Sequence, residues 1–178
     1  VLLHDVGKPP TFEVADRIRF NRHDRQGAEM AKAVCRRLRM PNSVTETVVK
    51  LIGTHMRFLD VREMRESRLK RWLRKPWFDD ALELHRLDCL ASHGDLSTYE
   101  WVRERYDALE PEHVHPPRLV TGHDLIEMGF APGPLFGEIL TAVEDAQLEG
   151  RVRTREQAIE FVHRGYGERR SQTTDERG

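Results

Sequence analysis

The sequence predicts an all-α fold, a helical bundle followed by a smaller helical body, on three observations. Apolar residues recur with the helical period of about 3.6 residues along almost the whole chain. No stretch longer than Ile18–Phe20 shows the β-branched alternation of a strand. Proline, glycine and capping patterns separate the periodic segments, as is typical of consecutive helices.

The N-terminal part of the chain is expected to hold three helices. The first ends at Gly7, because Pro9 and Pro10 block its continuation. The second covers about 24–39, and its apolar face comprises Ala28, Ala31, Val34, Cys35 and Leu38. Ser43 with Glu46 forms a capping-box pattern that opens the third helix. One side of that helix carries Val48, Leu51, Ile52 and His55.

The rest of the chain predicts further helices in two groups. A strongly basic segment over 61–75 is closed by Pro76, and helices follow at about 77–93 and 96–109. The second group lies at about 122–128, 134–148 and 155–164, and Thr154 with Gln157 caps the last of these. The turn-rich stretch 110–118 is the best candidate boundary. We therefore expect a domain over 1–109, truncated at its N-terminus, a helical C-terminal body over 110–166 and a disordered tail over 167–178.

The composition is that of a soluble globular protein. Charged residues make up 33% of the chain and hydrophobic residues 38%. No apolar run approaches the roughly 18 residues of a membrane span, and no signal-peptide pattern opens the chain. We expect a cytoplasmic protein with no membrane partner. The chain starts at Val1 inside an apolar stretch, which resembles a truncated start.

Charge is divided unevenly along the chain. Residues 1–75 carry 18 Lys and Arg against 9 Asp and Glu, whereas residues 76–178 carry 11 against 21. A basic N-terminal part favours a polyanionic partner such as nucleic acid. Ionic pairing between the two parts would produce the same counts, so both interpretations stay open.

Three His-Asp dipeptides are candidates for metal binding. They are His4–Asp5, His23–Asp24 and His123–Asp124. An imidazole and a carboxylate on adjacent residues at a helix end can converge on one cation. This donor set suits Mn, Fe, Ni or Zn and, with more oxygen and water, Mg. A helix cap or a surface pair is the alternative explanation for any single dipeptide.

Other donors accompany the first dipeptide. His23 opens the second predicted helix, and His55 lies at the end of the third on its apolar side. Several ligands from different helices are what a metal site requires, so His4 and Asp5 are the strongest candidates.

Asp88 is the further carboxylate that points to this site. It lies in the middle of a predicted helix among apolar residues, where an unpaired carboxylate is costly to bury. A metal held jointly by His4, Asp5 and Asp88 would satisfy it. An ion pair with Arg86 or Arg105 is the alternative.

The order of these motifs resembles one enzyme family. Along the chain come LLHDVGKP, RFNRHDRQGAEMA, LRMPNSV, LIGTHMRF and HRLDCLASHGDL. Together they resemble the HD domain of bacterial tRNA nucleotidyltransferases and poly(A) polymerases. The segment LVTGHDLIEMGFAPGPLFGEILTAVEDAQLEGRVRTREQA resembles the helical C-terminal body of the same family. The resemblance covers about residues 1–166.

The resemblance implies a metal-dependent phosphohydrolase site. In HD phosphohydrolases the metal is held by a His on an earlier helix, the His-Asp pair and a later Asp. The matching ligands here are His4, Asp5 and Asp88, with His23 and His55 for a second ion and the earlier His in the missing upstream segment. The resemblance gives Asp5 and Lys8 catalytic roles, in which Asp5 bridges the metals and Lys8 stabilises developing charge. The cofactor is expected to be a divalent ion, Mg, Mn or Ni.

The same resemblance leaves two functions open. The Gly-Ser turn and paired Asp residues of the nucleotidyltransferase head are absent from these residues, so the chain is expected to depend on a missing N-terminal nucleotidyltransferase domain. One function is phosphohydrolysis of phosphomonoesters or 2′,3′-cyclic phosphates. The alternative is a helical body that only holds tRNA or other RNA. Its expected RNA-binding residues are Arg68, Lys70, Arg71, Arg74 and Lys75.

Overall fold

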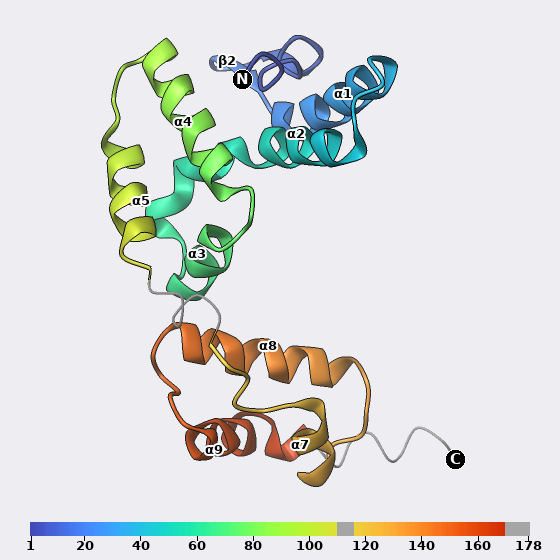
Figure 1. Ribbon diagram of the computed structural model, residues 1–178, viewed down its shortest axis with the longest axis vertical. Coiled ribbons are helices and arrows are strands. Elements are labelled where there is room, and N and C mark those ends of the chain that lie inside the picture. The colour runs from blue at the N-terminus through green and yellow to red at the C-terminus, as the bar shows by residue number, and fades with distance from the viewer. Residues whose placement is uncertain (110–115, 170–178) are drawn as a thin grey trace. The chain divides into compact units, whose positions relative to one another are not determined.

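The computed structural model describes residues 1–109 and 116–169. Within them every regular element is helical except one two-stranded sheet, which confirms the all-α class. The chain divides into two compact units, the first comprising Val1–Met64 and Leu73–Ala108. The second comprises Arg65–Trp72 and the residues from Leu109 onward (Figure 1). Part of the expected boundary stretch, 110–115, and most of the expected tail, 170–178, lie outside the described residues.

The chain opens with turns instead of the expected helix. The amides of His4, Val6 and Lys8 each donate to the carbonyl three residues earlier, so residues 1–8 form consecutive tight turns. The short 3₁₀ helix η1 (Pro9–Thr11) follows, because proline fixes a helical φ but offers no amide hydrogen for an α-helical bond. Strands β1 (Phe12–Val14) and β2 (Ile18–Phe20) then form an antiparallel hairpin.

Helices α1 (His23–Arg37) and α2 (Asn42–Thr54) pack through small side chains. Their shared core is made of Ala28, Ala31 and Ile52. Leu38, expected on the buried face, is exposed because α1 ends one residue earlier. The expected Ser43–Glu46 capping box is also wrong. Helix α2 already begins at Asn42 behind Pro41, which places Ser43 inside the first turn.

Three further elements complete the first unit. They are the 3₁₀ segment η2 (His55–Glu63), α4 (Phe78–Ser92) and α5 (Ser97–Asp107), and the two α-helices confirm the expected ones. Phe58 and Phe78 are almost fully buried, with ring centroids 6.4 Å apart. Helix α3 (Glu66–Leu73) covers the middle of the basic segment, and all of it except Leu73 belongs to the second unit.

The second unit adds α7 (Gly122–Glu127), α8 (Pro134–Leu148) and α9 (Arg155–Tyr166), close to the expected helices. The Thr154–Gln157 capping box is confirmed. The apolar core of this unit includes Leu125, Ile139 and Val162. Across the described ranges, no helix combines the length and apolarity needed to cross a membrane.

Candidate metal centre

Gly7 lets the N-terminal turns lie directly against α1. A Cβ atom on Gly7 would lie 2.1 Å from the carbonyl oxygen of His23 and 2.6 Å from the amide nitrogen of Gly27. Both neighbours are backbone atoms, so no side chain can occupy this place without moving one segment from the other. Only glycine permits this approach, which brings Asp5 close to the first residue of α1.

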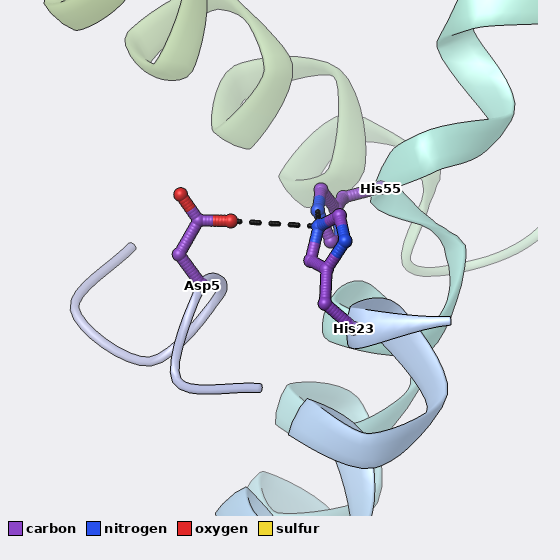
Figure 2. Close-up of side chains that lie close together, drawn as sticks. All are labelled: Asp5, His23 and His55. Carbon is purple, nitrogen blue, oxygen red and sulfur yellow. Dashed lines mark hydrogen bonds and ion pairs between the residues drawn. The ribbon is translucent and has the colours of Figure 1, made fainter. Parts of the chain in front are cut away.

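Asp5, His23 and His55 form a compact group of potential ligands. One ligand atom from each lies within 4.8 Å of the others. The Nε2 atom of His23 is 3.5 Å from Oδ1 of Asp5 and 3.2 Å from Nε2 of His55. Figure 2 shows the carboxylate directed at the two imidazoles, which come from the start of α1 and the start of η2.

His4 contacts the other oxygen of the same carboxylate and links it to Asp88. Nε2 of His4 lies 3.4 Å from Oδ2 of Asp5 and 3.2 Å from Oδ1 of Asp88 on α4. Asp5 therefore has one oxygen toward His23 and the other toward His4. The fold brings all five predicted ligands into one cluster arranged about a single bridging carboxylate.

The environment of Asp88 differs from the expected one. Its side chain is 42% exposed, so the argument from a buried carboxylate was wrong. The alternative ion pairs are not formed either, because Arg86 binds Glu83 through two hydrogen bonds and Arg105 stacks on Trp101. Asp88 stays in the site through its contact with His4.

The imidazoles of the cluster share one orientation. Nδ1 of His4 lies 2.6 Å from the carbonyl oxygen of Val1. The Nδ1 atoms of His23 and His55 lie 2.9 and 2.6 Å from the carbonyl oxygens of Phe20 and Ile52. A carbonyl oxygen only accepts, so Nδ1 carries a hydrogen in each ring and Nε2 is the nitrogen that faces the cluster, where it offers a lone pair when the ring is neutral.

The cluster therefore gathers acceptors with few donors. The lone pairs of His23 and His55 face each other across 3.2 Å, next to carboxylate oxygens that also only accept. Lys8 supplies one donor, with its Nζ atom 2.5 Å from Oδ2 of Asp5. Such an arrangement is stabilised by a cation between the acceptors, and backbone bonds at the outer nitrogens are typical of metal-binding histidines.

Protonation also suits a cation site. Burial raises the pKa of Asp5, but the hydrogen bond from Lys8 and the charges of His4 and His23 outweigh it, so the pKa is lowered overall. Burial lowers the pKa of His55 below its usual value. The carboxylate is thus ionised and the imidazole neutral near neutral pH, the forms in which both bind metals.

The cluster opens into a cleft of about 840 Å³. Its wall includes residues of the β1–β2 hairpin, the start of α1, η2 and the end of α4. A substrate in the cleft would have direct access to Asp5, His23, His55 and Asp88, all of which line it.

Comparison with known proteins assigns the family. The model of the family described as tRNA nucleotidyltransferase domain 2 matches residues 24–162. The chain belongs to this tRNA nucleotidyltransferase family. The match starts just after His23, so it covers α1 and the following elements, including His55 and Asp88.

Family members that are named for adding different nucleotides are similar to this chain over nearly its whole length. An A-adding tRNA nucleotidyltransferase of Deinococcus radiodurans is 34% identical over 92% of this chain and 40% of its own length. A CC-adding tRNA nucleotidyltransferase of Thermus thermophilus is 35% identical over 97% of this chain and 41% of its own length. The chain thus spans about two fifths of these relatives. No solved structure matches.

The expected RNA-binding residues of this family member have two kinds of surroundings. Arg68 and Lys75 are exposed, and Arg74 is half-buried. Lys70 donates to the carbonyl of Leu148, and Arg71 pairs with Glu144 and Asp145 on α8. Both of these contacts lie inside the second unit. Part of the uneven charge along the chain is therefore matched internally, which was the alternative interpretation.

The third His-Asp dipeptide serves as a helix cap. Asp124 accepts from the backbone and hydroxyl of Thr121 in a capping box at the start of α7, and Arg155 pairs with it. The Arg155 hydrogen bond, with those from Thr121, holds the pKa of Asp124 far below its usual range. His123 is exposed.

The sequence analysis did not identify Gly7 as a residue of the site. Its position between the His4–Asp5 dipeptide and Pro9 could have indicated a close approach of two backbone segments.

Proposed function

We propose that this chain is the metal-binding helical part of a tRNA nucleotidyltransferase and that its cluster hydrolyses phosphomonoesters or 2′,3′-cyclic phosphates. The observation that carries the proposal is the convergence of acceptor atoms on Asp5. Three imidazoles are held by backbone carbonyls at Nδ1. The Nε2 atoms of His4 and His23 face carboxylate oxygens, and Nε2 of His55 faces that of His23. No purely structural role requires acceptors to be directed at one another.

The donor set fits one or two divalent ions. His23, His55 and Oδ1 of Asp5 would hold one ion. His4, which lies next to Oδ2 of Asp5 and Oδ1 of Asp88, would help to hold a second. Imidazole and carboxylate together suit Mn or Ni, and Mg binds where water completes the oxygen ligands. A bound divalent ion supplies Lewis-acid stabilisation of charge on a phosphoryl group.

The chain's own residues then orient the reacting group. Asp5 links the two parts of the cluster, because its Oδ1 atom faces His23 and its Oδ2 atom faces His4. Lys8 lines the cleft, where its ammonium would donate to a phosphoryl oxygen. Its Nζ atom lies 5.8 Å from the ring centroid of Phe20, within reach of a cation–π interaction.

Calorimetric titration of the full chain with Mn²⁺ tests the metal site. His55→Ala is expected to lower Mn²⁺ affinity at least tenfold because it removes a ligand, and to abolish hydrolysis of adenosine 2′,3′-cyclic phosphate. The matched control is His123→Ala, which alters the exposed histidine of the capping dipeptide. Equal Mn²⁺ binding by the parent chain and His55→Ala would refute the proposal.

A second function, holding tRNA, is favoured by the comparisons. Relatives named for adding A and for adding CC match nearly the whole chain at similar identity. We infer that this part serves a task common to both, positioning tRNA, while nucleotidyl transfer belongs to the whole protein. Replacing the exposed Arg68 and Lys75 by alanine should weaken tRNA binding and flatten its salt dependence. An unchanged salt dependence would exclude this role for them.

A further inference from the structure

The cleft above the metal cluster has a basic wall that the cluster itself does not explain. Four arginines line it, namely Arg17, Arg19, Arg22 and Arg25, together with Lys8. The carboxylates that line it are Asp5, Asp24 and Asp88. Basic groups therefore outnumber acidic ones around a site built for a cation. Positive charges close to a cation site oppose metal binding, so they require a compensating anion in the cleft.

Three of these arginines are available for a ligand. Arg19 is paired with Asp16 at the hairpin turn. Arg17, Arg22 and Arg25 are exposed, and none has an ion pair or side-chain hydrogen bond within the stretches 1–109 and 116–169. Guanidinium groups bind phosphate oxygens through paired hydrogen bonds, more specifically than an ammonium group does.

Arg22 and Arg25 flank the metal-facing His23. Arg22 precedes it in the left-handed region, at φ 61°, as the residue at the N-cap of α1. A residue with a side chain rarely occupies this region, and the amide of Gln26 donates to the Arg22 carbonyl there. The backbone changes direction sharply at Arg22, and the consecutive residues Arg22 and His23 both line the cleft. His23 belongs to the cluster and Arg22 to the basic wall.

Apolar residues also line the cleft. They are Ile18 and Phe20 of β2 and Met56 and Leu59 of η2. Ile18 is 58% exposed and Leu59 is 73% exposed, although both are large apolar residues. A cleft that combines guanidinium groups with exposed apolar side chains fits a ligand with an anionic and a flat apolar part. A nucleoside phosphate has both.

We propose that Arg22 and Arg25 are the phosphate-recognition residues of this cleft and that the nucleoside of the ligand lies against Ile18 and Phe20. The proposal rests on the proposed function of the metal cluster and deepens it, by naming what selects the substrate. The ligand is a nucleoside phosphate, either free or at the end of an RNA. Arg17 adds attraction at the outer edge of the cleft.

The test separates metal binding from phosphate binding in the full chain. Calorimetry measures Mn²⁺ affinity first, and then the affinity for adenosine 3′-monophosphate at saturating Mn²⁺. The R22Q/R25Q double variant keeps polar side chains at both positions but removes both charges. We expect at least a tenfold loss of nucleotide affinity from two charged hydrogen-bonding groups. Mn²⁺ affinity should be unchanged or higher, because repulsion is reduced.

The matched control is R36Q/R37Q, which removes two exposed charges from the last turn of the same helix, away from the cleft. It should bind the nucleotide within about twofold of the parent. Circular dichroism establishes folding, and R25Q alone replaces the double variant if Arg22 proves necessary for folding. Equal nucleotide affinity in R22Q/R25Q (or R25Q) and the control overturns the proposal, as does a parent chain that binds adenosine as tightly as its 3′-monophosphate.

Two further arms complete the design. A short RNA with a 3′-phosphate, compared with the free nucleotide, identifies the source of the ligand, and the tenfold loss in R22Q/R25Q is expected for whichever binds more tightly. A parent chain that binds neither overturns the recognition proposal. Absence of Mn²⁺ binding in the parent refutes the metal proposal instead, so the two failures are distinguishable.

Discussion

Replacing Gly7 by alanine should disrupt the metal centre without touching a ligand. The new Cβ would lie 2.1 Å from the carbonyl oxygen of His23, whereas ordinary contact begins at 3.4 Å. The two backbone segments must therefore separate by about 1.3 Å. Metal–ligand distances tolerate only about 0.2 Å, so Asp5 and His23 can no longer share an ion without further rearrangement. We expect Mn²⁺ affinity to fall at least tenfold and the free energy of unfolding to fall by about 1–3 kcal/mol.

Calorimetry with Mn²⁺ and urea unfolding of the metal-free chain provide the two readouts. Gly53→Ala is the matched control, since its Cβ would meet only Ala28 Cβ at 3.7 Å, an ordinary contact. Alanine is favoured over glycine inside α2, so this variant should be as stable as the parent or more stable by about 1 kcal/mol. If Gly7→Ala bound Mn²⁺ as tightly as Gly53→Ala, the close backbone approach would not position the site.

Three further predictions concern pH, capping and charge. Burial lowers the pKa of both His55 and His85, so the unfolded chain binds more protons as pH falls below about 6.5. The metal-free chain should lose stability below that pH until the folded-state pKa values are passed, and urea unfolding of His85→Gln should show a shallower dependence. Asp124→Ala should cost about 1–2 kcal/mol in thermal unfolding, because it removes the capping box of α7; an unchanged melting temperature would count against it. In filter binding over a KCl series, Arg68→Ala should reduce the salt slope for tRNA by about one, whereas Arg71→Ala should mainly lower stability because that residue pairs within the second unit.

The helices could be predicted because their signals are local. Apolar spacing placed α1, α4 and α8 within a few residues, and the capping box at Thr154 is correct. The Ser43 box failed since Pro41 precedes it, and proline opens a helix by fixing its own φ. The helix expected before Gly7 was wrong, because the amides of His4, Val6 and Lys8 each donate to the carbonyl three residues earlier, as in tight turns.

The candidate site was predictable in membership but not in arrangement. The motif order named His4, Asp5, His23, His55 and Asp88, and the fold brings them together. Sequence spacing carries no information on which oxygen of Asp5 faces which histidine, because that depends on how three separate elements pack. The prediction that Asp88 is buried was wrong for the same reason. The helical period identifies the apolar face of a helix, but it does not show whether other elements cover the residues at the edge of that face.

The place of α3 in the fold has a consequence for how this protein can recombine with its relatives. Residues 65–72 belong to the second unit, yet they lie in sequence between two segments of the first, so the polypeptide passes between the units three times. A chimera that exchanges only residues from 109 onward would separate Lys70 and Arg71 from the Leu148 carbonyl and the Glu144 carboxylate with which they pair. The second unit is therefore encoded by two separate stretches of the sequence, and an exchange that keeps these contacts has to carry both.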